Sequence, residues 1–86
     1  MPIQLTERFV SQYLLLPVEI RIKVDRALLR LDADFQHPGL HSHPVHNTPG
    51  IFEAYVDRKY RMTFQRRGSV LVMRNVDNHD DCLKNP

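Results

Sequence analysis

The sequence contains one cysteine, no tryptophan and three glycines among its 86 residues. The single cysteine, Cys82, cannot form an internal disulfide, and its place in a polar C-terminal stretch gives neither a metal-ligand pattern nor a nucleophile site. Apolar stretches such as Tyr13 to Leu16 are far too short to cross a membrane, and no charged n-region followed by an apolar h-region marks the chain for export. We therefore expect a cytoplasmic protein that folds without disulfides and does not enter a membrane.

The motifs of several enzyme and binding classes are also missing. The few glycines do not form a phosphate-binding loop, and the chain has neither a serine nucleophile elbow nor a HExxH zinc motif. The aromatic residues of the predicted strands fall on the core side, which argues against a basic sheet that stacks single-stranded bases. The sequence therefore excludes the most easily recognised catalytic and nucleic-acid-binding patterns.

Composition and charge are those of an ordinary small globular domain. The chain is 42% hydrophobic and 26% charged, and its length fits one domain over residues 1–86 that buries a single core. The net charge is only +2, with a sequence pI near 9.0. The overall field is weak, so any anion binding must come from a local cluster of arginines and lysines.

Two helices are predicted in the first third of the chain. Ile3 to Leu5 is either a short strand or a frayed end, and Thr6 can cap a helix that runs to about Leu15. Pro17 breaks this helix and suits the first turn of a second one, which runs to Asp32. Residues 18–25 alternate like a strand, but the run is long and its apolar residues continue along one helical face. The apolar stripe of the first helix consists of Phe9, Tyr13 and Leu16, widened by Val10 and Leu14; that of the second consists of Ile20, Val24, Ala27, Leu28 and Leu31.

Three strands are predicted after Gly50, where the apolar period becomes two. The segment from Leu40 to His46 is polar and contains a proline, so if it is a strand it lies at a sheet edge. Together with the helices, this pattern indicates an α+β fold in which an N-terminal helical hairpin packs on a small antiparallel sheet.

Side-chain parity predicts the register of the two hairpins. A three-residue turn at Asp57 to Lys59 places Tyr55 opposite Arg61 and Glu53 opposite Thr63. A two-residue turn at Arg67 and Gly68 then places Arg61 opposite Arg74. Like charges in such a pair destabilise a sheet. Glu53 can neutralise part of the charge and an anionic ligand the rest, although both arginines can also extend into solvent.

A phosphodiester is the natural anion for two arginines, because their guanidinium groups can bind its oxygens and stabilise developing charge. Cleavage also needs a proton acceptor and a donor, and histidine can serve as both near neutral pH. His79 directly follows the last predicted strand, unless it is only a solvated tail residue held by neighbouring aspartates. The other candidates are His37, His41, His43 and His46, of which His41 and His43 share one side of a strand and could chelate a metal. No cysteine or carboxylate at ligand spacing supports that metal site.

The order of these segments resembles the RelE/ParE superfamily of bacterial type II toxins. The resemblance is carried by the two helices joined at Leu-Pro, by PGIFEAYVD (49–57), by YRMTF (60–64) and by LVMRNVDNHD (71–80). It implies an α+β domain that acts as a ribosome-dependent messenger-RNA endonuclease and is silenced by a cognate antitoxin. The ParE branch of the superfamily instead inhibits DNA gyrase.

The resemblance also implies roles for individual residues. Arg61 falls on the strand arginine that contacts the scissile phosphate, and His79 falls near the catalytic position after the last strand. His43, which precedes Pro44, resembles the histidine of the YafQ-like branch. Leu83 stands where an aromatic residue is usual, so the stacking of a base at that position is not expected. We assign substrate binding to Arg74, Arg58, Lys59, Tyr55 and Lys84.

The sequence therefore predicts a metal-independent and cofactor-independent endoribonuclease. His43 would take the proton of a ribose 2′-OH, Arg61 helped by Arg74 would stabilise the transition state, and His79 would protonate the leaving oxygen. The expected partners are an antitoxin and mRNA on the ribosome. The alternative is a binding module of the same fold that docks on gyrase, or an inactive toxin-fold protein that binds only an antitoxin.

Overall fold

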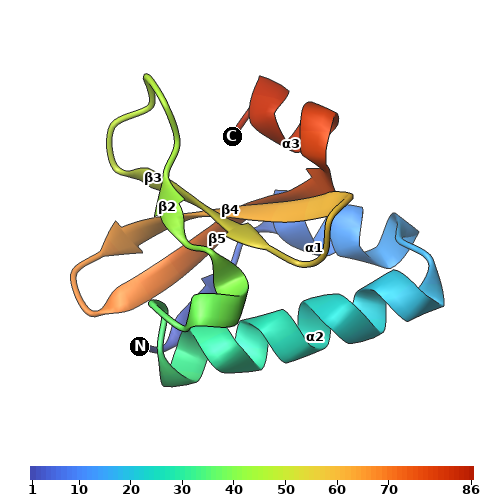
Figure 1. Ribbon diagram of the computed structural model, residues 1–86, viewed down its shortest axis with the longest axis horizontal. Coiled ribbons are helices and arrows are strands. Elements are labelled where there is room, and N and C mark those ends of the chain that lie inside the picture. Colours follow the sequence, from blue (N-terminus) through green and yellow to red (C-terminus); the bar gives the residue numbers. More distant parts are fainter.

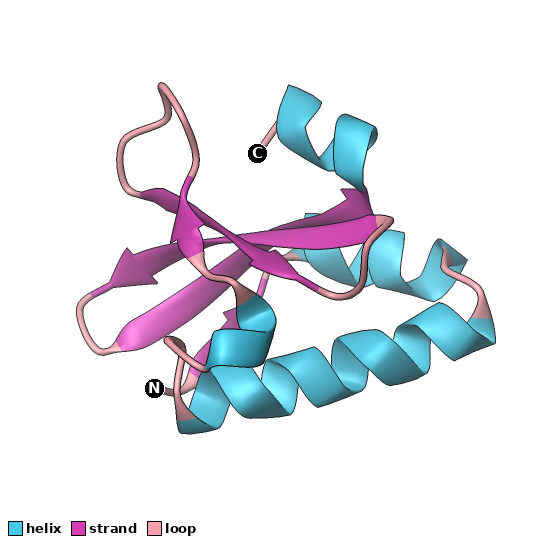
Figure 2. Ribbon diagram, in the orientation of Figure 1, coloured by secondary structure: helices cyan, strands magenta, loops and turns pink.

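The computed structural model describes residues 1–86 and arranges them in three layers. Figure 1 shows the helices α1 (Glu7–Leu15) and α2 (Val18–Ala33) on one side of a five-stranded sheet and the short helix α3 (His79–Lys84) on the other. In Figure 2 the loop between the second and third strands rises on the same side of the sheet as α3. The strands are β1 (Ile3–Leu5), β2 (His43–Pro44), β3 (Ile51–Tyr55), β4 (Tyr60–Arg67) and β5 (Val70–Asn78), and a 3-10 helix, η1 (Pro38–Leu40), precedes β2.

The sheet is mixed, because its first strand runs parallel to its last. The strand order is β1-β5-β4-β3-β2. Residues 3–5 form a strand rather than a frayed end, with Ile3 opposite Leu71 and Leu5 opposite Met73. The remaining pairs are antiparallel, and β2 occupies the opposite edge, as predicted. The α+β class is therefore confirmed, with one parallel edge strand added to the antiparallel sheet that the sequence predicts.

The helical hairpin forms within a residue or two of its predicted bounds. The Thr6 hydroxyl oxygen accepts a hydrogen bond from the Phe9 amide at 3.2 Å and caps α1. The predicted widening of the α1 stripe is wrong, since Val10 and Leu14 are 39% and 62% exposed. The packing of α1 on β5 leaves the flank that carries Val10 and Leu14 exposed. None of the helices combines the length and hydropathy that a membrane crossing requires.

The core lies between the helices and one face of the sheet. Its rings include Phe52 and Phe64, which face each other across β3 and β4 with centroids 5.6 Å apart. Close burial of such apolar groups is the main favourable contribution to folding. The buried core residues of the helices and of η1 are Phe9, Leu16, Val24, Ala27, Leu31 and Leu40, and those of the sheet are Ala54, Met62, Phe64, Leu71, Met73 and Val76.

The register of the first hairpin is as predicted, and that of the second is not. Tyr55 pairs with Arg61 across β3 and β4. The second turn consists of Gly68 and Ser69 instead of Arg67 and Gly68, since Arg67 pairs with Val70. Gly68 has a φ of 58°, which suits the first position of a two-residue hairpin turn.

A β-bulge changes the register further along the second hairpin. The shift falls between Thr63 and Phe64 on β4, which pair with Asn75 and Met73, so that Arg74 has no partner across the ladder. Arg61 consequently lies opposite Asp77. The predicted opposition of Arg61 and Arg74 is wrong, and an oppositely charged pair takes its place.

A C-terminal helix that the sequence analysis does not predict covers the other face of the sheet. Asn78 caps α3: its Oδ1 accepts from the Asp81 amide at 3.0 Å, and its Nδ2 donates to Asp81 Oδ2 at 2.7 Å. This hydrogen bond, together with one from Lys84, lowers the pKa of Asp81. Cys82 is fully buried beneath the helix. It anchors α3 to the sheet, since Asn75 Nδ2 donates to its carbonyl oxygen at 2.7 Å.

We predict that Cys82 of the native protein does not react with a thiol reagent. Its S–H donates to the Arg61 carbonyl oxygen at 3.4 Å, and burial, with Glu53 adding to it, raises its pKa to about 12. Labelling followed by mass spectrometry should proceed only as α3 opens, and Asn75→Ala should accelerate it. Gln36→Ala serves as the control, because Gln36 is an exposed residue of the loop between α2 and η1. Labelling of the folded wild type as fast as of denatured protein would contradict this burial.

Candidate functional site

A buried ion pair lies at the centre of the sheet face that α3 partly covers. Glu53 on β3 and Arg61 on β4 are only 4% and 7% exposed. Arg61 Nε lies 3.2 Å from Glu53 Oε1, although its N–H does not point directly at that oxygen. Charges buried to this extent need an opposite charge or hydrogen bonds close by. Each of these two side chains provides that compensation for the other.

The Arg61 guanidinium is also bound to the turn between β3 and β4. Its Nη1 donates to the carbonyl oxygens of Asp57, of Arg58 at 2.7 Å and of Tyr60 at 3.2 Å. The Arg61 Cζ lies 3.7 Å from the centroid of the Tyr55 ring, in a cation–π contact. Nη1 makes all the hydrogen bonds of this guanidinium within the chain, and Nη2 is left to meet a ligand or water. Arg61 is thus a rigidly held cation with one free end.

Asp57 fixes the conformation of that turn. Its Oδ1 accepts hydrogen bonds from the amides of Lys59 and Tyr60, both at 2.8 Å, and its Oδ2 pairs with Lys23 of α2 at 3.1 Å. Burial alone would raise the pKa of Asp57, but these amides and the Lys23 ammonium lower it below its ordinary value. The turn that carries the acceptors of Arg61 is therefore tied to the helical layer.

A polar recess of about 490 Å³ opens where this turn meets the start of α3. The His79 amide donates to the Lys59 carbonyl oxygen at 2.6 Å and joins the two segments. The His79 imidazole is half exposed, and its Nδ1 lies 3.2 Å from Asp80 Oδ1. No hydrophobic residue lines the recess; its walls are Arg58, Lys59, Arg61, Asn78, His79 and Asp80. Four of the residues predicted for the site are thus gathered in one place.

His43 lies in a second recess, on the β2 side of the ion pair. This recess has a volume of about 340 Å³ and also contains Glu53 and Leu83. His43 Nε2 lies 3.9 Å from Glu53 Oε2, and its Nδ1 lies 2.7 Å from the carbonyl oxygen of His41. The two predicted catalytic histidines therefore do not share a recess. The Glu53–Arg61 pair connects them, since one residue of the pair lines each recess.

Three of the predicted substrate-binding residues lie outside both recesses: Tyr55, whose ring contacts Arg61, and the cations Arg74 and Lys84. Arg74 Nε donates to the Pro86 oxygen at 3.1 Å, and its Nη1 donates to Gln65 Oε1 at 3.4 Å. Lys84 is exposed and pairs with Asp81 at 3.4 Å. The cations that do accompany Arg61 are Arg58 and Lys59.

Sequence reasoning missed part of this arrangement. It treated Glu53 only as a partial neutraliser and assigned no role to Asp57. The signal for Asp57 was available, because an aspartate two residues before a backbone amide in a tight turn commonly accepts its hydrogen bond. No group of three or more histidine, cysteine or acidic side chains is close enough to hold a metal ion.

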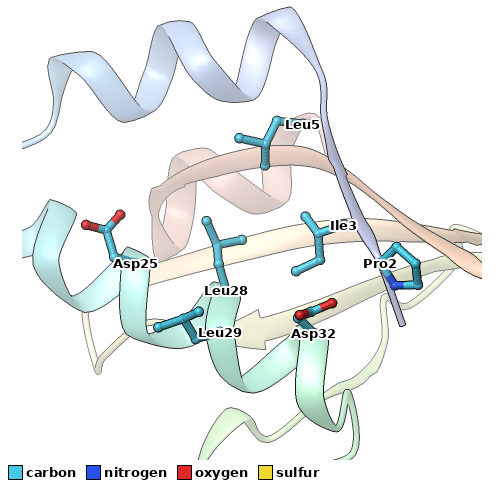
Figure 3. Close-up of a pocket in the computed structure, with 7 residues that line it drawn as sticks. All are labelled: Pro2, Ile3, Leu5, Asp25, Leu28, Leu29 and Asp32. Carbon is cyan, nitrogen blue, oxygen red and sulfur yellow. The ribbon is translucent and has the colours of Figure 1, made fainter.

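The largest recess of the molecule is apolar and lies on the helical side, away from these residues. Figure 3 shows Ile3 and Leu5 of β1 facing Leu28 and Leu29 of α2 across it. Its volume is about 600 Å³, and Leu29 is 71% exposed beside it. Asp25 and Asp32 complete its lining together with Pro2. Such a surface is more suited to contact with another protein than to polar chemistry.

Comparison with known proteins defines the fold. No protein-family model and no curated sequence matches the chain. Among solved structures, it is similar to YafQ from E. coli strain BL21(DE3), with a TM-score of 0.75 and 14% identity over 92% of this chain and 93% of that one. A YoeB/ParE toxin from Agrobacterium tumefaciens gives 0.78 and 13% over 92% and 99%. The RelB-RelE antitoxin-toxin complex from Methanococcus jannaschii gives 0.76 and 14% over 95% and 98%. The resemblance to RelE/ParE toxins is thus confirmed at the level of the fold.

We predict that Asp57→Ala lowers the free energy of unfolding by about 1–2 kcal/mol, because two amides lose a charged acceptor. Asp57→Asn, which keeps an acceptor oxygen but loses the charge, should cost less. Since the folded pKa of Asp57 is lowered, its charge stabilises the fold above the unfolded pKa and ceases to do so as the pH falls through the folded pKa.

Chemical denaturation between pH 2 and 7 measures this contribution, and the wild type should lose its advantage over Asp57→Asn at the acid end, near and below the ordinary aspartate pKa of about 3.9. A difference that stays constant across this range would show that the Asp57 charge does not stabilise the turn.

Proposed function

We propose that this protein is the toxin of a type II toxin-antitoxin system and that it cleaves mRNA on the ribosome. The observation that carries the proposal is the wholly polar recess, in which Arg58, Lys59 and Arg61 surround His79 on a RelE/ParE-like fold. Such a cluster suits the phosphate of an RNA backbone, because guanidinium and ammonium groups bind its oxygens and a histidine can transfer a proton beside them. No metal or organic cofactor is needed for this chemistry.

The proposed reaction is an attack of the ribose 2′-oxygen on the adjacent phosphorus. His43 accepts the proton of the 2′-OH, and the new bond forms as the bond from phosphorus to the 5′-oxygen breaks. His79 donates a proton to that leaving oxygen, which gives a 2′,3′-cyclic phosphate and a free 5′-OH. The Nη2 end of Arg61 stabilises the charge on the phosphoryl oxygens. Arg58 and Lys59 assist Arg61, a role that the sequence analysis assigns to Arg74.

Glu53 keeps the catalytic groups in fixed positions in this scheme. Its carboxylate lies between Arg61 at 3.2 Å and His43 at 3.9 Å. A substrate phosphate that spans the two recesses would therefore meet a cation and a base held by one buried acid. Preorganisation of this kind lowers the reorganisation that accompanies the reaction.

The proposed partner besides RNA is an antitoxin, and the proposed location of the complex is the cytoplasm. The RelE-like structure from Methanococcus jannaschii is a complex of toxin and antitoxin. An acidic or amphipathic antitoxin segment would suit the arginine face. The exposed apolar recess of Figure 3 offers a second surface for such a protein.

The alternative function is binding without catalysis, as in a gyrase inhibitor or an inactive toxin-fold protein. One observation favours it: Arg61 is 7% exposed and already has protein partners on its Nε and Nη1 atoms. Expression in cells separates the two functions, since a nuclease arrests protein synthesis whereas a gyrase inhibitor induces DNA-damage signalling. Expression without effect in a host that lacks the antitoxin would indicate an inactive protein.

We predict that ribosomes and mRNA treated with the purified protein yield fragments with 2′,3′-cyclic phosphate ends. His79→Ala should reduce the cleavage rate about 10²- to 10⁴-fold, the usual contribution of a general acid. The imidazole is half exposed and its one polar partner is Asp80, so the variant should fold. Arg61→Lys, which keeps the charge but not the planar fork, should also lose activity.

Arg67→Ala is the control, because this arginine is exposed at the far end of β4 and lies outside both recesses. Primer extension and end-group analysis measure the products. Full cleavage by His79→Ala would remove His79 from the mechanism, and an absence of cleavage by the wild type would favour the binding function.

A further inference from the structure

A row of side chains in contact through their flat groups crosses the polar face of the sheet next to the two recesses. The Tyr55 ring contacts the Arg61 guanidinium, at 3.7 Å, and the His41 imidazole, whose centroid is 4.7 Å away with the two rings tilted by 41°. His43 approaches the same ring edge-on at 6.5 Å. Tyr55 is thus an exception to the expectation that the aromatic residues face the core.

The register of the sheet explains this row. Tyr55 pairs with Arg61 on one side of β3. On the other side, β3 pairs with β2, where His43 lies opposite Glu53, and His41 lies two residues before His43, just beyond the end of β2. Side chains that lie level on neighbouring strands share one face of a sheet and contact each other. Arg61 therefore reaches Tyr55 from β4, and His41 reaches it from the segment that precedes β2.

The backbone holds His41 at the end of the row. Its φ is 48°, in the left-handed region that residues other than glycine seldom adopt. His41 caps the 3-10 helix η1, and its amide donates to the Pro38 carbonyl oxygen at 3.3 Å. Its own carbonyl oxygen lies 2.7 Å from His43 Nδ1. An exposed ring held in this unusual conformation is a common feature of binding sites.

We propose that His41 and Tyr55 form a docking site for a nucleobase of single-stranded RNA, an inference that rests on the proposed function. A base continues the row by stacking on the exposed His41 imidazole. Histidine and tyrosine rings are frequent stacking partners of unpaired bases, and each stacked base contributes substantially to affinity.

The link between this row and the polar recess favours a nucleotide over other ligands. Arg61 belongs to both, because it stacks on Tyr55 and also lines the recess with Arg58 and Lys59. A ligand with a phosphate in the recess and a flat ring on the row satisfies both surfaces. An aromatic side chain of a protein partner would offer a ring but no phosphate. Comparing two ligands that carry the same phosphate, one with a base and one without, shows whether the base itself is bound.

The test compares two ligands of the full chain by NMR, AMP and ribose 5-phosphate, which carry the same phosphate with and without a base. AMP should shift the ring signals of His41 and Tyr55 and bind more tightly, whereas ribose 5-phosphate should shift only signals of the polar recess. His41→Ala should weaken AMP binding about 5- to 100-fold, the usual effect of losing one stacked base. It should leave ribose 5-phosphate binding unchanged.

His41→Phe should retain the preference for AMP, since phenylalanine also stacks bases. Gln36→Ala is the control, because this exposed, uncharged residue precedes the same segment and lies outside both recesses. Equal affinity of the wild type for the two ligands, a preference that survives in His41→Ala, or no binding of AMP at all would each overturn the proposal. Circular dichroism verifies that the variants fold.

The outcome is distinguishable from that of the nuclease assay. If the wild type does not cleave mRNA but shows the base-dependent preference, the docking site stands and the proposed reaction falls. If the wild type cleaves mRNA and His79→Ala does not, while AMP and ribose 5-phosphate bind equally, the reaction stands and only the docking site falls.

Discussion

The buried contact between Arg61 and Glu53 is the constraint on which the polar face of the sheet depends. Two charges that are almost fully removed from water must compensate each other, and loss of either partner leaves an uncompensated charge that costs about 3–5 kcal/mol. The pair joins β3 to β4, and the three carbonyl oxygens that accept from Arg61 add the turn. The pair also meets the other candidate groups: Tyr55 contacts Arg61, His43 lies 3.9 Å from Glu53, and Arg61 lines the polar recess. Stability and candidate chemistry therefore share the same two residues.

Local periodicity was enough to predict the helical hairpin and the first β-hairpin. Thr6 and Pro17 mark helix starts by general backbone rules, and the alternation around Asp57 leaves one register that keeps apolar residues together. No comparable pattern specifies the register of the second hairpin. A bulge at Arg74 adds one residue and reverses the parity beyond it, and nothing in the local sequence distinguishes that residue from its neighbours. The predicted arginine pair failed because of this bulge and because the turn lies one residue further along the chain than predicted.

The candidate site was predictable as a set of residue types but not as an arrangement. Arg61 and His79 could be chosen from the sequence, and they line one recess with Arg58 and Lys59. That His43 lies in a different recess depends on how β2 pairs with β3 and on what α3 covers, which are contacts between distant segments. The helix α3 was missed although Asn78 is a good cap, because a six-residue helix derives its stability from packing, here through Cys82, more than from its own sequence.

The parallel pairing of β1 with β5 has a consequence for when the candidate site can form during synthesis. The first strand of the chain has no place in the sheet until residues 71–73 exist to receive it. Contacts between such distant segments form late, because a long loop must close first. The strand that completes the sheet also leads directly into His79. A ribosome that is still making these segments is therefore attached to an unfinished sheet, and the candidate site forms only after residues 71–79 have emerged.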